Sequence, residues 1–519
     1  MNRRTIIFIL VAILVAWTAA VFLPARHFDF VNWDDYNEVT ENPNLHPPTA
    51  HHLHEIWSGP YLRLYAPLSY SAWWMLMQIP GAADNPAAFH LLNIALHLAC
   101  VALVFSILIV CVKSPMAAFG GAAIFALHPI QVESVGWVAE MNNLLAATLS
   151  LAAIRLYLAC RQAMVKAQWW YFVAFIVYLL ALFAKPTAVV VPLVALILDV
   201  GFLRNSWRSA VWPLLPWVAA AGIFGWIAHA SQLAPATPPL DRPVVAIDTL
   251  AFYVGKIFWP TGLTIDYGRT PSRVLTGHIL LGNLAVLAML VAVLWILWRN
   301  YRGIVLGALV MLTALLTVLG LIPFGFQEYS TVADHFLYLG MLGPSLAVAV
   351  VLARTPGKWV LPISAALGVG LAVLSAQQLK IWRGSATLVA RALAIDPGSA
   401  IGNGIVGAQL DRSGKPALAV PFFTAAIARD PGNPEFHYNL GNALLRMGEY
   451  DKSIAELETA IPLFHPPSGK AMNNLGVAYA KVGRRGEAVV EFRQVLMIDP
   501  QNAEALRNLH ILSANVPSR

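Results

Sequence analysis

Charged side chains are scarce in this sequence. Asp, Glu, Lys and Arg make up 12% of the 519 residues, whereas a soluble globular protein carries roughly 25%. Hydrophobic residues make up 58%. This balance excludes an ordinary soluble domain for most of the chain and predicts that most of it lies in lipid. The net charge of +7 does not indicate nucleic acid binding, because the basic residues fall in short loops between apolar segments.

Cysteine is also rare. Cys100, Cys111 and Cys160 all lie in or beside apolar segments, so neither a disulfide framework nor a metal-type spacing is predicted. Four histidines between His46 and His54 match no zinc template. We therefore expect no resident metal or cofactor, with a divalent cation as the open alternative. The sequence also lacks a Walker-type phosphate loop, a strand-linked GxGxxG and a GxSxG elbow, which argues against an ATP-driven pump.

Long apolar segments fill the first 378 residues. Residues 5–24 follow Arg3 and Arg4 directly and are long enough to cross a bilayer, so they predict an uncleaved first helix rather than a signal peptide. Basic residues in the later connections follow the positive-inside rule and predict about 11 crossings. The predicted crossings are residues 5–24, 90–112, 115–129, 142–160, 168–184, 187–203, 211–230, 276–297, 304–323, 336–353 and 359–378.

Two further segments are predicted to be helices that do not cross. A crossing at residues 247–265 would leave Arg299 and Arg302 on the outer side, so a surface or re-entrant helix is predicted there. The segment from Tyr65 to Ile79 is short and rich in Trp and Tyr, which predicts an interfacial helix. This topology places the N-terminus in the cytoplasm. It places the loop of residues 25–89 and the C-terminal region outside.

The loop of residues 25–89 contains the sequence FDFVNWDDYNEVTENPN from Phe28 to Asn44. The presence of two adjacent carboxylates, Asp34 and Asp35, calls for an explanation, because Asp and Glu total only 27 residues in the chain. One interpretation is a solvated loop with helix-capping aspartates. The other is an extracytoplasmic active site in which one carboxylate is the general base. Two adjacent acids raise each other's pKa, which suits a base.

Other polar groups on the predicted outer side are candidates to act with this pair. Lys185 lies between two apolar segments, where an ammonium is costly unless it is paired, and a lipid phosphate would satisfy it. Arg63 and Arg269 are further candidates, because a guanidinium matches phosphate geometry. Each group is alternatively a solvated or interfacial side chain. The outer groups are Arg63, His128, Glu133, Glu140, Lys185, Arg269, Glu328, Asp334 and His335.

Residues 379–519 change character and show an internal repeat. The pattern is that of tetratricopeptide repeats, in which small residues lie where two helices cross and a large apolar residue fills the groove. We predict three full repeats, a preceding half-repeat and a capping helix near residues 501–514. Such an array stacks into a superhelix with a concave face for a peptide or protein, and Asn439 and Asn474 are predicted to line it. The recurring positions are Pro397, Pro431, Pro466 and Pro500; Gly407, Gly441 and Gly476; Ala419, Ser453 and Ala488; Phe423, Leu457 and Phe492; and Ala426, Ala460 and Val495.

Short motifs follow one another in a specific order before this array. They are Trp33-Asp34-Asp35-Tyr36, Tyr65-Ala66-Pro67-Leu68, Phe89-His90-Leu91-Leu92-Asn93 with His97, His128-Pro129 with Glu133-Ser134-Val135 and Trp137, Lys185-Pro186, Trp259-Pro260, and Ala333-Asp334-His335-Phe336 with Tyr338. Over essentially its whole length the chain resembles the transmembrane and tetratricopeptide repeat-containing proteins of the animal endoplasmic reticulum and their bacterial relatives. That family is placed among the GT-C glycosyltransferases, which take a sugar from a polyprenyl-phosphate carrier on the extracytoplasmic side.

The resemblance implies roles for individual residues. It implies a catalytic base at Asp34 or Asp35, basic groups that hold the donor phosphate, and residues that support the substrate site. The implied phosphate-binding groups are Lys185, Arg63, Arg269 and His335, and the implied supporting residues are His90, His128, Glu133, Asp334 and Tyr338.

The chain departs from the family pattern at two places. Asp334-His335-Phe336 stands where relatives often show Ala-Asp-Arg-Tyr, and Met141 stands where an Arg commonly follows the Glu133 loop. If those arginines bind the carrier phosphate in relatives, either another basic group substitutes here or the donor differs.

These features predict an all-α enzyme with a polytopic membrane domain, residues 1–378, and a tetratricopeptide α-solenoid, residues 379–519. It would move a hexose, mannose in the animal members, from a polyprenyl-phosphate donor to Ser or Thr hydroxyls of protein. The expected partners are the lipid-linked sugar, an acceptor protein in the repeat groove and the bilayer. The expected location is the bacterial inner membrane with a periplasmic repeat domain. A membrane-anchored scaffold for envelope or secretion proteins and a ligase or polymerase of lipid-linked glycans are the two alternatives.

Overall fold

The computed structural model describes residues 2–62, 64–163, 167–231, 237–277, 280–464 and 467–514. Across these ranges the chain is helical and forms no strand beyond one isolated bridge, which confirms the predicted all-α class. The chain divides into two compact units, Met1–Leu388 and Val389–Arg519.

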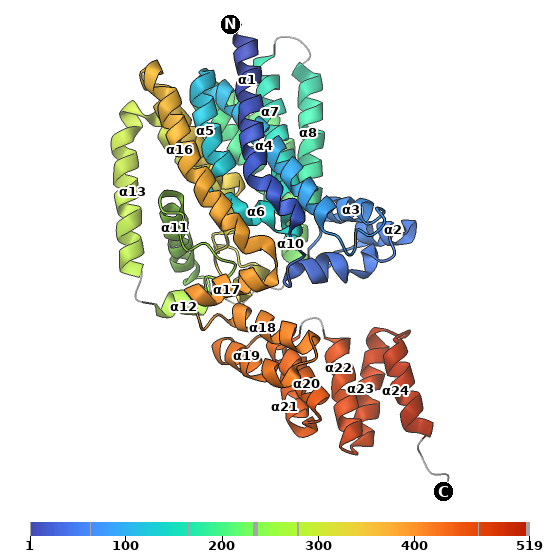
Figure 1. Cartoon of the computed structure of the whole chain (residues 1–519). Coiled ribbons are helices and arrows are strands. Elements are labelled where there is room, and N and C mark those ends of the chain that lie inside the picture. Colours follow the sequence, from blue (N-terminus) through green and yellow to red (C-terminus); the bar gives the residue numbers. More distant parts are fainter. Residues whose placement is uncertain are drawn as a thin grey trace. The chain divides into compact units, whose positions relative to one another are not determined.

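The first unit is a bundle of apolar helices (Figure 1). Within the described ranges, eight helices are long and apolar enough to cross a membrane, and a pair bent by 49° makes nine if it counts as one span. The two remaining predicted crossings contain shorter helices, Arg302–Leu315 and Leu339–Leu352. The bundle helices are α1 (Arg3–Phe22), α4 (Ala87–Val112), α5 (Pro115–Leu127), α7 (Met141–Gln162), α8 (Ala167–Ala184), α9 (Val191–Leu198), α10 (Trp207–Ser231), α11 (Arg242–Phe258), α13 (Leu280–Asn300), α14 (Arg302–Leu315), α15 (Leu342–Leu352) and α16 (Gly357–Leu379).

Helix α5 lies at the centre of this bundle. Every residue from Ala117 to Leu127 is buried, because α5 packs against α1, α4, α15 and α16. Small residues permit this close packing. A Cβ atom on Gly121 would lie 2.4 Å from the carbonyl oxygen of Ser345 in α15, so only glycine fits. The Gly/Ala-rich composition of this short segment is thus explained by helix contact.

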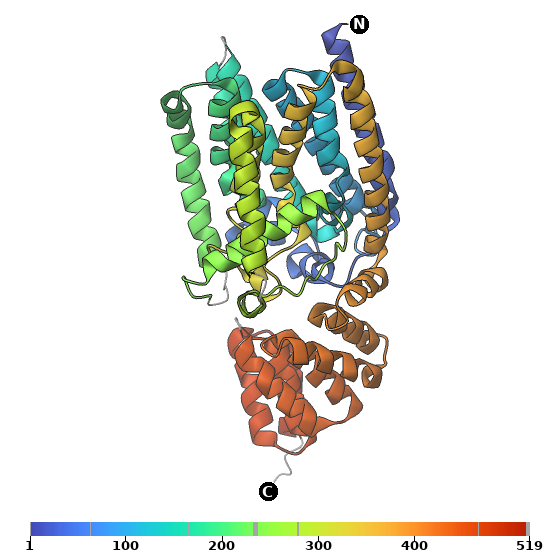
Figure 2. The ribbon, with the colours of Figure 1, turned by 90° about the vertical axis from the view of Figure 1, so that its left-hand side faces the viewer.

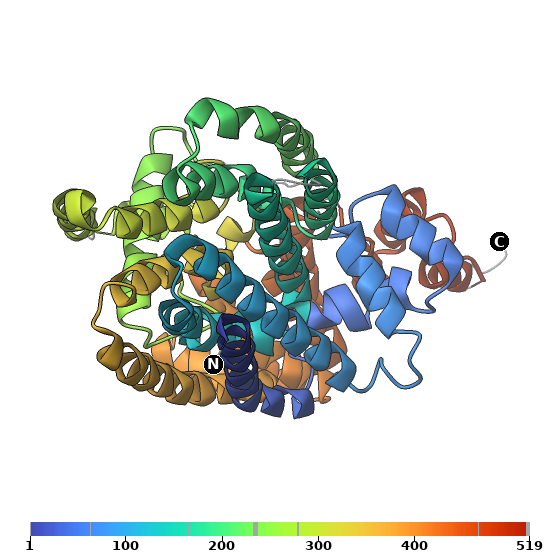
Figure 3. The ribbon, with the colours of Figure 1, turned by 90° about the horizontal axis from the view of Figure 1, so that it is seen from above.

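Helix α13 stands at the left-hand edge of the bundle in Figures 1 and 3 and in front of the bundle in Figure 2. It contacts α11 and α14, and none of its residues is buried. Near its first turn the Asn283 side chain donates a hydrogen bond to Asp248 in α11 at 2.8 Å. The rest of its apolar surface, with Trp295 81% exposed, needs apolar surroundings of the kind that a bilayer supplies.

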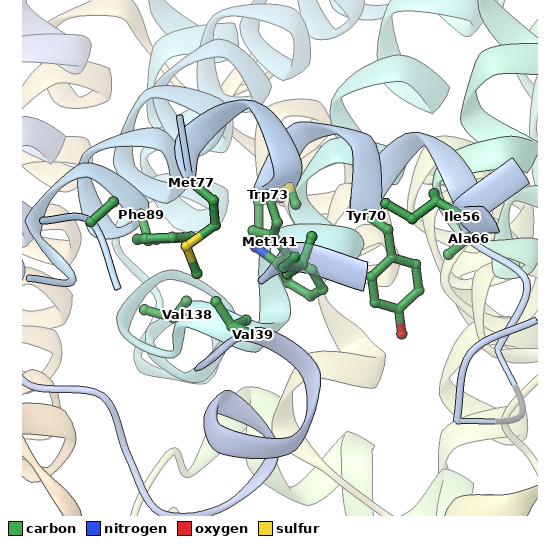
Figure 4. Close-up of a cluster of buried hydrophobic side chains, with 11 residues drawn as sticks. Val39, Ile56, Ala66, Tyr70, Trp73, Met77, Phe89, Val138 and Met141 are labelled. Carbon is green, nitrogen blue, oxygen red and sulfur yellow. The ribbon is translucent and has the colours of Figure 1, made fainter. Parts of the chain in front are cut away.

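The loop between α1 and α4 is folded rather than solvated. It contains the short helices η2 (Asp35–Thr40), α2 (Ala50–Ser58) and α3 (Pro67–Leu76), and its apolar side chains form a hydrophobic cluster with residues of α4, η5 (Val138–Glu140) and α7 (Figure 4). The helix predicted within Tyr65 to Ile79 is present as α3, with Tyr70 and Trp73 buried in that cluster. Val39 of η2 packs there with Val138 of η5. This packing holds the acidic loop against the turn that precedes α7.

The second unit contains the predicted repeat array. Three helix pairs form the full repeats, α17 precedes them and α24 follows them, as the sequence predicted. In each repeat the glycine of the first helix faces the large apolar residue of the second, Phe423, Leu457 or Phe492. The helices are α17 (Ser385–Ile395), α18 (Ala400–Arg412), α19 (Pro416–Arg429), α20 (Pro434–Met447), α21 (Tyr450–Leu463), α22 (Gly469–Lys481), α23 (Arg485–Ile498) and α24 (Ala503–Ala514).

Replacing Gly441 with Val should destabilise the repeat array. A Cβ atom there would lie 2.8 Å from Cγ of Leu457, so a branched side chain forces α20 and α21 apart, at a cost of ~1–3 kcal/mol. Gly486→Ala is the matched control, because a Cβ atom at Gly486 meets nothing within 4 Å. Scanning calorimetry of the full-length protein measures both. A melting temperature that Gly441→Val leaves unchanged would contradict this packing.

Candidate functional site

Acidic side chains from three separate parts of the first unit gather around Lys185 and Glu133. They come from the loop after α1, from α6 (Val132–Gly136) with η5, and from η9 (Asp334–Leu337) before α15. Lys185 itself stands in the turn after α8 and interacts electrostatically with Asp34, Glu38 and Glu133. The acids of the cluster are Asp34, Asp35, Glu38, Glu133, Glu140 and Asp334. Residues that are distant in sequence, and that the sequence singled out, therefore do meet.

Asp35 is a structural member of this cluster. Its side chain is 1% exposed, and its two oxygens accept hydrogen bonds from the backbone N–H groups of Val31 at 2.9 Å and Ala139 at 2.8 Å. These bonds join the first loop to η5. Burial raises the pKa of Asp35 to about 7, although the two N–H donors favour its charged form. Since both oxygens are occupied, Asp35 is poorly placed to accept a substrate proton.

Asp34 differs from its neighbour in its exposure and in its hydrogen bonds. Its side chain is half-buried, and within the described residues its carboxylate accepts no hydrogen bond. Burial and the nearby charge of Glu140 raise the pKa of Asp34 to about 7, while Lys185 acts in the opposite direction. A carboxyl group whose oxygens accept no hydrogen bond among the described residues, and whose pKa lies near neutrality, is suited to general base chemistry.

Lys185 is held by two polar partners on η5 and α7. Its Nζ donates to Oδ1 of Asn142 at 3.1 Å and lies 3.9 Å from Oε2 of Glu140. The lysine side chain is 14% exposed, so these partners compensate for the lost hydration of the ammonium. Lys185 thus supplies a positive charge beside Asp34.

Glu133 and His335 form a tight pair on the other side of Glu140. Nδ1 of His335 lies 2.5 Å from Oε1 of Glu133, and Nε2 lies 3.6 Å from Oε1 of Glu140. Burial lowers the pKa of His335 to about 4, so the imidazole is neutral near pH 7. The role of His335 in holding the donor phosphate stays a prediction. A neutral imidazole offers a hydrogen bond only.

Asp334 is fixed from the loop after α11. The Tyr267 hydroxyl donates to Oδ1 of Asp334 at 2.7 Å, and burial raises the pKa of Asp334 well above its ordinary value. The Tyr253 hydroxyl of α11 donates to the carbonyl of Ala333 at 2.9 Å. Sequence inspection missed both tyrosines, because only folding brings α11 and its following loop to η9.

Four other residues that were predicted to belong to the site make contacts outside the acidic cluster. Arg269 donates to both oxygens of buried Asp248, which already compensates its charge. The His90 ring packs on Phe28.

His128 and Tyr338 make structural contacts elsewhere in the bundle. Nε2 of His128 contacts the carbonyl of Ile257 at 3.1 Å, which ties α5 to α11. The Tyr338 hydroxyl lies 2.7 Å from Nδ1 of His97 inside the bundle. Arg63 lies outside the described residues. Lys185 is therefore the candidate phosphate-binding cation that the structure places in the acidic cluster.

Replacing Asp35 with Asn should destabilise the first unit. The amide keeps one acceptor and turns an NH₂ group toward a backbone N–H, which leaves a buried donor unpaired at a cost of ~1–3 kcal/mol. Asp84→Asn is the matched control, since Asp84 is an exposed acid of the same loop. Thermal unfolding of the purified protein measures the difference. Equal melting temperatures for the two variants would contradict the structural role of Asp35.

Asn439 and Asn474, predicted to line the peptide groove, lie in the first helices of adjacent repeats. Both are partly exposed, and Nδ2 of Asn474 donates to Oδ1 of Asn442 at 3.4 Å. Their role in binding a peptide stays a prediction. Over the described residues, no group of three or more His, Cys, Asp or Glu side chains is arranged to hold a metal ion.

Comparison with known proteins identifies the class of the C-terminal region. Family models for the tetratricopeptide repeat match residues 412–475 and 469–502. The Small glutamine-rich tetratricopeptide repeat-containing protein 2 of Mycosarcoma maydis is 31% identical over 84 residues, which is 16% of this chain and 24% of that protein. The chain thus spans about a quarter of the length of this curated relative. The C-terminal region is a tetratricopeptide repeat array, as the sequence predicted.

Several solved structures of other proteins are similar to about a quarter of the chain. The second repeat domain of human RPAP3, solved with an HSP70 peptide, is 28% identical, with 22% of this chain and 94% of that chain covered and a TM-score of 0.21. MamA AMB-1 is 26% identical, with 26% and 78% covered and a TM-score of 0.21. YrrB, a repeat protein with an unusual peptide-binding site, is 22% identical, with 28% and 72% covered and a TM-score of 0.22.

Proposed function

We propose that this protein is a membrane-embedded glycosyltransferase that moves a hexose from a polyprenyl-phosphate donor to a protein hydroxyl. The observation that carries the proposal is the half-buried Asp34 carboxylate beside Lys185 in a cluster of buried acids. The family resemblance of the motifs around these residues supports the same chemistry. The bilayer setting rests on the eight long apolar helices among the described residues.

In the proposed reaction Asp34 acts as the general base. A Ser or Thr hydroxyl oxygen bonds to C1 of the hexose while the bond from C1 to the phosphate oxygen breaks. The hydroxyl proton passes to Asp34, and the polyprenyl phosphate leaves with the bonding electrons. Lys185 stabilises the charge that develops on the leaving phosphate.

The surplus of carboxyl groups must be reconciled with an anionic donor. A phosphate would be repelled by a fully ionised cluster. Burial raises the pKa values of Asp34, Glu38 and Asp334, which disfavours the fully ionised state of the cluster and lowers this repulsion. The same burial makes the interaction between Lys185 and a phosphate stronger than it would be in water.

The repeat array is proposed to select the acceptor. Tetratricopeptide arrays offer a concave surface for extended peptides, and two of the solved relatives are described with chaperone peptides. Asn439 and Asn474 carry amide groups suited to backbone hydrogen bonds of such a peptide. An acceptor held there would be a protein segment rather than a free glycan.

Sugar transfer in membranes tests the proposal. Membranes from cells that make the protein, and from cells that do not, receive labelled polyprenyl-phosphate hexose, and the label is followed into protein and into glycan. Labelled protein that appears only in membranes containing this chain supports the proposal. Label in glycan instead favours a ligase. Absence of any dependent transfer contradicts an enzymatic role and favours a scaffold that recruits proteins through its repeats.

A further inference from the structure

A continuous run of aromatic rings borders the acidic cluster. It begins at Trp33, the residue before Asp34, whose ring meets that of Tyr329 edge to face with centroids 5.5 Å apart. Phe326 continues the run, 6.0 Å from Tyr329 and 5.8 Å from the His335 ring. The run therefore connects the residue beside the proposed base with the Glu133–His335 pair.

These rings are not simply part of the hydrophobic core. Trp33, Phe326 and Tyr329 are all partly exposed, whereas the acids Asp35 and Asp334 beside them are almost fully buried. A patch of accessible rings next to buried polar groups has the composition of a small-molecule site, with apolar walls and a few polar groups that fix orientation.

The indole of Trp33 adds a second, independent observation. Its Nε1 atom is shielded from solvent and donates a hydrogen bond to no group among the described residues. A buried donor without an acceptor is costly, and Trp N–H groups ordinarily find a partner when they are buried. An incoming group that carries hydroxyl oxygens would supply that acceptor after a small movement of the ring.

We infer that Trp33, Tyr329 and Phe326 form the subsite for the hexose of the lipid-linked donor. This inference rests on the proposed function and assigns the sugar-binding part of the same site. The C–H face of a hexose is apolar and weakly positive, so it packs on the negative face of an aromatic ring, while its hydroxyl groups reach neighbouring donors and acceptors.

Position decides between the sugar and the polyprenyl tail as the occupant. The tail would also pack on aromatic rings, but the carbon that is transferred must come within reach of the hydroxyl that Asp34 deprotonates. The group that packs on these rings is therefore the hexose, since the run of rings reaches the His335 ring of the acidic cluster. The tail extends away from this point.

Binding of two lipids to the purified full-length protein tests the subsite. We expect wild type to bind polyprenyl-phosphate hexose about tenfold more tightly than polyprenyl phosphate without sugar. Trp33→Ala and Tyr329→Leu should each bring this ratio close to one and leave binding of the sugar-free lipid unchanged. Trp33→Phe keeps a ring without the N–H and should give an intermediate ratio. Trp169→Ala, which removes a 60% exposed Trp of α8, is the matched control.

The possible outcomes separate this inference from the proposed function. A wild-type ratio of one, or a ratio that both Trp33→Ala and Tyr329→Leu leave intact, overturns the hexose subsite even if transfer to protein is observed. Weaker binding of an acceptor peptide with an unchanged lipid ratio also overturns it, in favour of an acceptor site. Failure of wild type to bind either lipid or to transfer sugar overturns the proposed function together with the subsite.

Discussion

Replacing Asp34 with Asn should abolish sugar transfer while the protein folds normally. The amide has nearly the same shape and cannot accept the hydroxyl proton, and loss of a general base lowers rates by about 10²–10⁴-fold. Because Asp34 is half-buried and its carboxylate makes no hydrogen bond among the described residues, the substitution breaks no structural contact. Transfer of labelled hexose in purified membranes measures the loss.

The pH dependence of transfer gives a second test of Asp34 as the general base. The pKa of Asp34 is raised to about 7, and only the deprotonated carboxylate acts as a base. The wild-type kcat/KM should therefore rise as the pH increases through about 7 and level off above it. Asp84→Asn, the exposed acid of the same loop, should keep both the rate and the profile. Full activity of Asp34→Asn would assign the acidic stretch a structural role.

Replacing Lys185 with Met should weaken use of the donor strongly. A charged hydrogen bond to a phosphate contributes ~1.5–3 kcal/mol, so the KM for the lipid-linked sugar should rise roughly 10- to 100-fold. The value of kcat should fall as well, because the leaving phosphate loses its positive partner. Steady-state kinetics with varied donor concentration separates the two effects. Lys358→Met, an exposed lysine at the start of α16, is the control.

A double variant distinguishes donor binding from a structural role of Lys185. Removal of the ammonium leaves Glu140 without the cation that lies 3.9 Å away, and an unpaired buried charge is destabilising. Lys185→Met with Glu140→Gln should restore the melting temperature without restoring transfer. Recovery of transfer in this double variant would show that Lys185 acts only by balancing Glu140.

Local sequence signals were sufficient to predict most of the helices of the fold. Gly441 and Leu457 stand in the phase that two crossing helices of a repeat require, and this spacing alone placed α20 and α21. Apolar length identified the bundle helices in the same way. The irregular ends of α5 and α15 were harder to foresee, because short turns such as η9 are fixed by contacts with distant segments.

The sequence singled out charged residues of the candidate site, but it did not reveal the hydrogen bonds and aromatic rings around them. Asp34, Glu133 and Lys185 stood out because charges beside apolar segments are rare and costly. The sequence did not separate the roles of Asp34 and Asp35, which differ in burial and in the N–H groups of Val31 and Ala139 that bind Asp35. Nor did it reveal the aromatic run, since Trp33 and Tyr329 meet only after the chain has folded.

In the proposed bilayer setting, the lipid around helix α13 is a component of the fold. With none of its residues buried, it gains little from protein packing, and its place depends on the match between its 21 residues and the thickness of the hydrocarbon layer. A thinner or thicker bilayer would tilt this helix and pull on the Asn283–Asp248 contact at its foot. Since Arg269 shares Asp248, membrane thickness would be transmitted to the loop that carries Tyr267, and through the Tyr267 hydroxyl to Asp334 in η9.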